Sequence, residues 1–205
     1  LGQDSIVNTF DKNTLVLYSP LSISLSNKTI EGNIIIRSDR NIIIEASSNI
    51  NNIICYAKGI IIEKNSNINA QIFAQDSIVV EENCKLNYPS VLAVLGKGNS
   101  TTQRKISIGE NVELKGSIFL YNENYDRKNQ ALVSVGENSK IMGQIYASEM
   151  LELKGKVMGG VFCSNFLLKT PSSVYQNHLM DVVIDRMALS EHFVGVALTE
   201  AIQHQ

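Results

Sequence analysis

Three acidic residues in this sequence have a spacing that could create a cation site. Glu45, Glu63 and Glu81 lie 18 residues apart, so a fold that stacks these positions would align three carboxylates, which are the oxygen ligands that hard cations prefer. Gly109 and Gly136 take the same position in later repeats. We therefore interpret the three carboxylates as solvated turn residues rather than as a metal site.

Other signatures of catalysis or cofactor binding are incomplete. Segment 96–101, GKGNST, has the composition of a phosphate-binding loop but lacks the GxxxxGK[ST] spacing. The histidines His178, His192 and His204 have no metal-binding spacing, and no histidine precedes residue 178. A hexapeptide-repeat acyltransferase would need a histidine on a coil, and the acids of a polysaccharide-degrading solenoid would be clustered. The sequence predicts a protein that is not an enzyme, with no catalytic residues, no cofactor and no metal.

Composition limits the partners and the redox chemistry. The 205 residues include 18 Lys+Arg and 20 Asp+Glu, a formal charge of -2, which argues against nucleic acid as a partner. Cys55, Cys84 and Cys163 are odd in number and lack CxxC spacing, so we expect packing thiols rather than disulfides or a zinc site. No apolar run is long enough for a transmembrane segment.

The start of the chain bears on its compartment. It begins at Leu1 rather than Met, and we expect that a leader, anchor or tag preceded this residue. This hint favours an extracytoplasmic over a cytoplasmic location and leaves the compartment open.

The elements that position these residues come from an internal repeat. Six units of about 18 residues align, each with three short apolar patches separated by polar turns, a pattern typical of three strands per coil. The units begin at Ile42, Ile60, Ile78, Ile106, Val133 and Leu151. The repeat predicts an all-β fold, a right-handed parallel β-helix or solenoid. In a left-handed hexapeptide solenoid, aliphatic residues recur every six residues. This sequence lacks that recurrence, so we disfavour the left-handed form.

An asparagine column supports the repeat. Asn65, Asn83, Asn111 and Asn138 occupy one turn position in four units. Asparagine tolerates the left-handed backbone conformation, and stacked amides can hydrogen-bond from coil to coil.

We divide the chain into two parts. Residues 1–171 are expected to form a single β-helix domain, with insertions at 96–105 and 121–130. Residues 172–205 are expected to form a helical cap or cover, because segment 172–189 has apolar residues at helical spacing.

A column of apolar side chains is expected on the outer surface of the third strands. Its predicted members are Cys55, Phe73, Leu92, Phe119, Tyr146 and Phe162. A surface of this size is seldom bare on a soluble monomer. We expect it to be covered by the tail, by the segment from Leu15 to Leu25, or by a partner or second copy.

The two insertions have equal length and follow the third strands of adjacent coils, so we expect them to emerge side by side. Tyr121 and Tyr125, beside Asn122, Asn124 and Asp126, could stack on a sugar and hydrogen-bond to it. The alternative is a solvated loop without a ligand.

The motif I-x-I-G-E-N-x-x-[IL]-x-G-x-I occurs as ISIGENVELKGSI and VSVGENSKIMGQI and resembles the bactofilins, the polymer-forming cytoskeletal proteins of bacteria. The resemblance covers roughly residues 34–166. It implies a right-handed, roughly triangular β-helix that assembles end to end without nucleotide and scaffolds cell-shape or envelope proteins. It carries over no catalytic residues. The insertions, the N-terminal strand-rich segment and the tail depart from the pattern, and each could block polymerisation.

These patterns together predict a non-catalytic structural or scaffold protein of the bacterial cell envelope or cytoskeleton. Its partners would be other copies of itself or envelope proteins. The alternative hypothesis is an extracytoplasmic adhesin or carbohydrate-binding solenoid that holds glycans, and a third is a polysaccharide-degrading enzyme.

Overall fold

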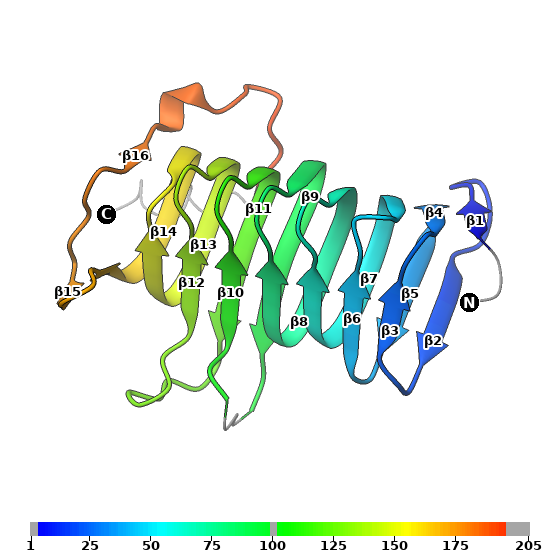
Figure 1. Ribbon diagram of the computed structural model, residues 1–205, viewed down its shortest axis with the longest axis horizontal. Helices are drawn as coiled ribbons and strands as arrows, with labels where there is room; N and C mark the ends of the chain where they lie inside the picture. The colour runs from blue at the N-terminus through cyan, green and yellow to red at the C-terminus, as the bar shows by residue number, and fades with distance from the viewer. Residues whose placement is uncertain (1–3, 99–101, 196–205) are drawn as a thin grey trace, which may run out of the picture.

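The computed structural model describes residues 4–98 and 102–195, which form β-strands and one 3-10 turn. Strands from successive turns of the chain lie side by side, nearly all in parallel (Figure 1). The prediction of an all-β fold with a parallel core is therefore confirmed. The described strands are β1 (Ser5–Asn8), β2 (Leu15–Ser19), β3 (Ile23–Leu25), β4 (Thr29–Gly32), β5 (Ile34–Ser38), β6 (Asn41–Ile44), β7 (Asn49–Ile62), β8 (Asn67–Val80), β9 (Lys85–Gly96), β10 (Lys105–Ile108), β11 (Glu113–Asn122), β12 (Leu132–Val135), β13 (Lys140–Leu153), β14 (Lys156–Lys169), β15 (Val174–Gln176) and β16 (Val183–Ile184).

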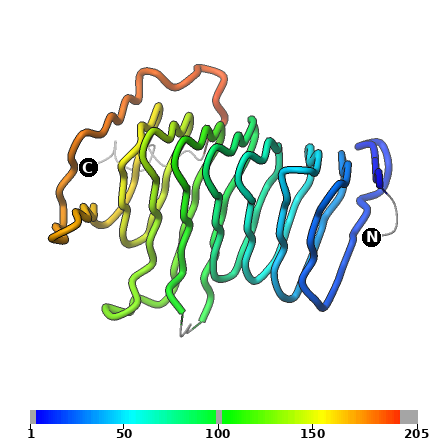
Figure 2. The backbone as a smooth tube through the Cα atoms, viewed as in Figure 1, coloured from blue at the N-terminus to red at the C-terminus, as the bar shows by residue number. Residues whose placement is uncertain are grey.

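The first apolar patch of every repeat lies in parallel register with the next. Ile42 pairs with Ile60, Ile60 with Ile78, and the series continues through Ile106 and Val133 to Leu151. The backbone tube shows the same succession of turns along the long axis (Figure 2). The repeat starts read from the sequence are confirmed for this strand.

Alternation of side chains along each strand builds the core. In β10 and β12, Ile106, Ile108, Val133 and Val135 are buried, while the residues between them are partly exposed. Neighbouring side chains of a strand point to opposite faces, so one face of every strand points inward. Each buried aliphatic side chain contributes roughly 1.5–3 kcal/mol relative to an exposed one. The buried side chains form one continuous cluster along the stack.

The asparagine column marks a left-handed turn in consecutive coils. Asn65, Asn83, Asn111 and Asn138 have φ values of 64°, 58°, 55° and 58°, as predicted. The backbone N–H of Asn65 donates to Glu82 O at 3.0 Å, and Asn83 and Asn111 make the equivalent bond to the next coil. Backbone groups thus provide the coil-to-coil hydrogen bonds of this turn.

The three cysteines are free thiols, as expected. Cys55 and Cys84 are buried and Cys163 is partly buried. Complete burial raises the pKa of Cys55 to about 12, because the thiolate would lose its hydration.

The Cys55 thiol should make stability depend on pH. Because its folded pKa exceeds the unfolded value, its contribution is intact below about pH 9 and is lost as the pH rises toward about 12. At pH 10 the wild type should lose about 1 kcal/mol relative to its value at pH 7, beyond the loss of a Cys55→Val variant. Urea unfolding of both proteins at the two pH values measures the difference. Identical pH slopes would contradict this assignment.

The predicted helix in segment 172–189 is wrong. This segment forms β15, β16 and a 3-10 turn at Arg186–Ala188. β16 joins the free edge of β14, where Val183 and Ile184 pair with Lys156 and Val157, and β15 forms an antiparallel pair with β14. The unpaired strand edge offers the tail backbone hydrogen bonds, and β-branched residues suit a strand. Residues 196–205 of the predicted cap lie outside the described residues.

Candidate functional site

The third strands of successive coils carry a row of side chains in direct register, most of them aromatic. We call this set the aromatic row. It consists of Tyr18, Arg37, Tyr56, Phe73, Ala93, Phe119, Tyr146 and Phe162. The predicted members Phe73, Phe119, Tyr146 and Phe162 all lie in it.

Two predicted members of the surface column are wrong. Cys55 and Leu92 are both 0% exposed and belong to the core. A register shift next to Asn52, which has φ 54°, displaces the strand so that Tyr56 faces outward and is 41% exposed. A second shift between β8 and β9 makes Ala93 the partner of Phe73. The β7 shift adds one residue, which reverses the faces of the strand after it, and the β9 shift adds two residues before Val91, so a constant period misplaces both strands.

Aromatic rings of the row stack in two pairs. The Tyr56 and Phe73 ring centroids are 4.9 Å apart with planes at 17°, and those of Phe119 and Tyr146 are 4.7 Å apart at 15°. Ala93 lies between the pairs and has no ring, so the row is interrupted there. Because the faces of paired rings lie against each other, the row presents mainly ring edges outward.

Two shallow cavities follow the row. One of about 690 Å³ lies beside Tyr56 and Phe73, and one of about 430 Å³ lies between Phe73, Phe119 and Tyr146.

Within the described residues, the tail lines the second cavity and contributes no residue to the lining of the first. After β16 the chain runs back across the coils (Figure 1). The rings of Phe193 and Tyr88 are 6.0 Å apart, and the Val194 N–H donates to the Tyr88 hydroxyl at 3.4 Å. Val194 and Gly195 line the second cavity. Segment 15–25 provides β2 and β3 of the first coil, so the prediction that it covers the column is wrong.

The two insertions contact each other, as predicted. The Gln103 amide donates to Gln130 O at 2.7 Å, and the Gly98 N–H donates to Glu123 Oε2 at 3.4 Å. Both loops leave the same corner of the stack (Figure 1).

A buried polar network joins these insertions to the core, and the sequence reasoning missed it. Arg104 and Glu149 are 6% and 4% exposed. The Arg104 guanidinium donates to Asn122 Oδ1 and to Lys97 O at 2.9 Å. Asn122 Nδ2 donates to Glu149 Oε1 at 2.8 Å, and the Ala131 N–H donates to Glu149 Oε2 at 2.8 Å. Arg104 lies near the end of the first insertion, whereas Glu149 lies in β13, so no spacing in the sequence links the two charges.

The two candidate tyrosines of the second insertion occupy different surroundings. Tyr121 is 44% exposed and continues the outer face beside Leu95. Tyr125 is 63% exposed, and its hydroxyl accepts from Gln130 Nε2 at 3.1 Å. A cavity of about 200 Å³ is lined by Tyr125 but not by Tyr121. The structure therefore does not place both rings around one sugar-sized space.

Acidic and histidine side chains do not gather into a metal site. Within residues 4–98 and 102–195, no group of three or more His, Cys, Asp or Glu side chains could hold an ion. Glu45 accepts from the Ser24 hydroxyl, whereas Glu81 accepts from the Lys64 N–H.

The two ends of the stack differ. β1, β2 and β3 each pair on one edge, with β4, β5 and β6 respectively, and no described strand covers their other edge. Large apolar side chains are exposed at this end, namely Val7, Phe10, Leu15, Val16, Tyr18 and Leu21. At the opposite end, β15 and β16 cover parts of β14.

No protein-family model, curated protein or solved structure matches this chain. In the part of the chain that the structure describes, no helix is both long and apolar enough to cross a membrane.

Proposed function

We propose that this chain is a right-handed parallel β-helix that acts as a non-catalytic scaffold of the bactofilin kind, in a bacterial envelope or cytoskeleton. It associates with a second copy through its N-terminal coil. The open strand edges and exposed apolar side chains at that end carry the proposal. Strand edges of this kind form hydrogen bonds with another chain unless they are blocked.

The sequential parallel pairing supports the β-helix. Each repeat pairs with the repeat that follows it, and the shared core runs through all of them, which is how a solenoid buries a surface that one coil could not bury alone. The 18-residue period and the IGEN motif support the bactofilin-like assignment.

The difference between the ends determines the expected assembly. A filament needs two open ends that fit each other, but β15 and β16 obstruct the C-terminal end. Two N-terminal ends can meet about a twofold axis, which gives a closed dimer. The protein would then be a dimeric scaffold rather than a filament subunit.

Val16 offers a specific test of the edge. The Leu15 N–H donates to Asn33 O at 3.1 Å, toward β5, so the N–H of the next residue points to the open edge. A Val16→Pro variant removes this donor and leaves the bonds to β5 in place. We expect its dimer dissociation constant, measured by sedimentation velocity, to rise at least tenfold.

The matched control changes a similar side chain at the other end. Val16 is 55% exposed and Val174, on β15, is 63% exposed. Val16→Lys should weaken the dimer like the proline variant, whereas Val174→Lys should not change it. Equal effects of the two lysine variants would contradict association through the N-terminal coil.

A further inference from the structure

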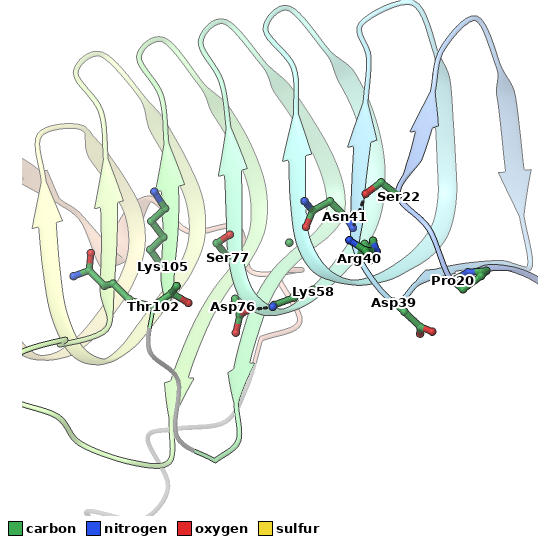
Figure 3. A pocket seen from close by; sticks show the side chains of 12 residues that line it. Pro20, Ser22, Asp39, Arg40, Asn41, Lys58, Asp76, Ser77, Thr102 and Lys105 are labelled. Atoms are coloured by element: carbon green, nitrogen blue, oxygen red, sulfur yellow. Dashed lines mark hydrogen bonds and ion pairs between the residues drawn. The ribbon is translucent and has the colours of Figure 1, made fainter.

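An open groove with a volume of about 960 Å³ lies at the corner between the third and first strands. We call it the corner groove. Register-equivalent residues of five successive coils form its floor, Ser22, Asn41, Gly59, Ser77 and Lys105. Figure 3 shows the four that it labels following one another across the coils. At ~4.8 Å per coil, the floor is about 19 Å long.

Small side chains form part of the groove floor, and the first insertion contributes to its lining. Gly59 has no side chain, and Ser22 and Ser77 have short ones, while the Asn41 side chain between them reaches toward Gly59, its Oδ1 2.9 Å from where a Cβ at Gly59 would lie. Thr102 and Gln103, from the first insertion, also line the groove, and Figure 3 shows Thr102 close to Lys105. The groove therefore suits an extended ligand that crosses the coils.

The charge of the corner groove is opposite to that of the whole chain. Its lining includes three cationic residues, Arg40, Lys58 and Lys105, and two acidic ones, Asp39 and Asp76, a sum of +1 in a chain of -2. Both acids have partners: Asp76 lies 3.8 Å from the Lys58 ammonium, and Asp39 accepts from the Tyr18 hydroxyl. Among the described residues, Arg40 and Lys105 form no ion pair, so their charges are available to an anion.

The side chains that line the corner groove favour some classes of ligand over others. Ten of the twelve lining residues have polar side chains, and none is aromatic. An apolar peptide would lack a pocket for an anchoring side chain, and a single-stranded nucleic acid would lack rings on which its bases stack. Hydroxyl, amide and cationic groups in a line suit a polymer whose repeating units carry hydroxyl and anionic groups.

We propose that the corner groove binds a linear anionic polysaccharide, which lies across the coils and contacts Arg40 and Lys105 through its carboxylate or sulfate groups. Each exposed ion pair contributes little by itself, but several units of one polymer bind along the corner groove at the same time. The inference does not depend on self-association.

The test compares two pairs of charge-removing substitutions. Arg40→Gln with Lys105→Gln changes the groove, whereas Lys85→Gln with Lys140→Gln removes the same charge from exposed positions on other strands. Isothermal titration with polygalacturonate oligomers and with heparin measures binding. We expect the groove pair to weaken binding of at least one polymer tenfold or more, and the control pair to change it less than twofold. Fully methyl-esterified polygalacturonate, which has the same backbone without charge, should bind at least tenfold more weakly than the free acid.

A charge-neutral variant keeps the test independent of electrostatics. Ser77→Trp fills the floor of the groove from an outward-facing position, so thermal unfolding should be unchanged while polymer binding is lost. The proposal is overturned if neither polyanion binds, if both charge pairs lose affinity equally, or if Ser77→Trp binds normally. Tighter binding of oligothymidylate than of either polysaccharide would also overturn it, in favour of nucleic acid.

Discussion

A Gly143→Ala substitution should lower the free energy of unfolding by at least about 3 kcal/mol. Gly143 has φ 153°, and Gly116 and Gly159, its partners in the neighbouring coils, have φ 149° and 151°. A Cβ at Gly143 would overlap the carbonyl oxygen of Gly116. Backbone strain and a clash with main-chain atoms would therefore act together. The melting temperature should fall by roughly 6–12 °C in calorimetry.

Gly160 provides the control in an adjacent coil. Its φ is not in the left-handed region, and the nearest atom to an added Cβ is on the Phe162 ring at 3.3 Å. Gly160→Ala should cost less than about 1 kcal/mol. Equal destabilisation by both substitutions would contradict the close approach of the backbones at Gly143 and Gly116.

An Asn122→Ala substitution should destabilise the protein by about 3 kcal/mol, because it leaves two buried charged groups without a shared partner. The amide of Asn122 bridges Arg104 and Glu149. Its loss should also release the second insertion from the core. Guanidinium unfolding measures the first effect, and the rate of proteolysis within residues 121–130 measures the second.

Lys128→Ala, an exposed change in the same insertion, should leave both quantities close to wild type. Asn122→Ala and Glu149→Gln should also be non-additive, since both remove one network. If the two changes in the free energy of unfolding were strictly additive, Asn122 and Glu149 would not be energetically coupled.

Much of the stack could be predicted from the sequence because its repeat is visible residue by residue. The starts at Ile60, Ile78 and Ile106 lie in the register that the apolar pattern indicates. The asparagine turns were predictable for the same reason, since only a few residue types tolerate positive φ.

The third face could not be assigned correctly from the period alone. Asn52 and the additional residues around Pro89 shift the register within a repeat, and a shift of one residue exchanges the inner and outer faces. Asn52 and Pro89 are residue types that fit a bulge, but the repeat pattern does not show which neighbouring residue leaves the register.

The tail and the buried network depend on contacts between distant segments. The apolar spacing from Leu179 to Met187 fits a helix, yet the open edge of β14 binds Val183 and Ile184 as a strand. Arg104 and Glu149 meet through Asn122 only because two insertions emerge at one corner. Both features required the assembled stack.

Light scattering of the wild-type chain over a range of concentrations distinguishes a dimer from a monomer and from a filament. Pairing through the N-terminal coil predicts a mass of twice 22.6 kDa at high concentration, which falls toward 22.6 kDa on dilution. A mass of 22.6 kDa at every concentration, or a mass that grows without limit, would contradict the dimeric scaffold.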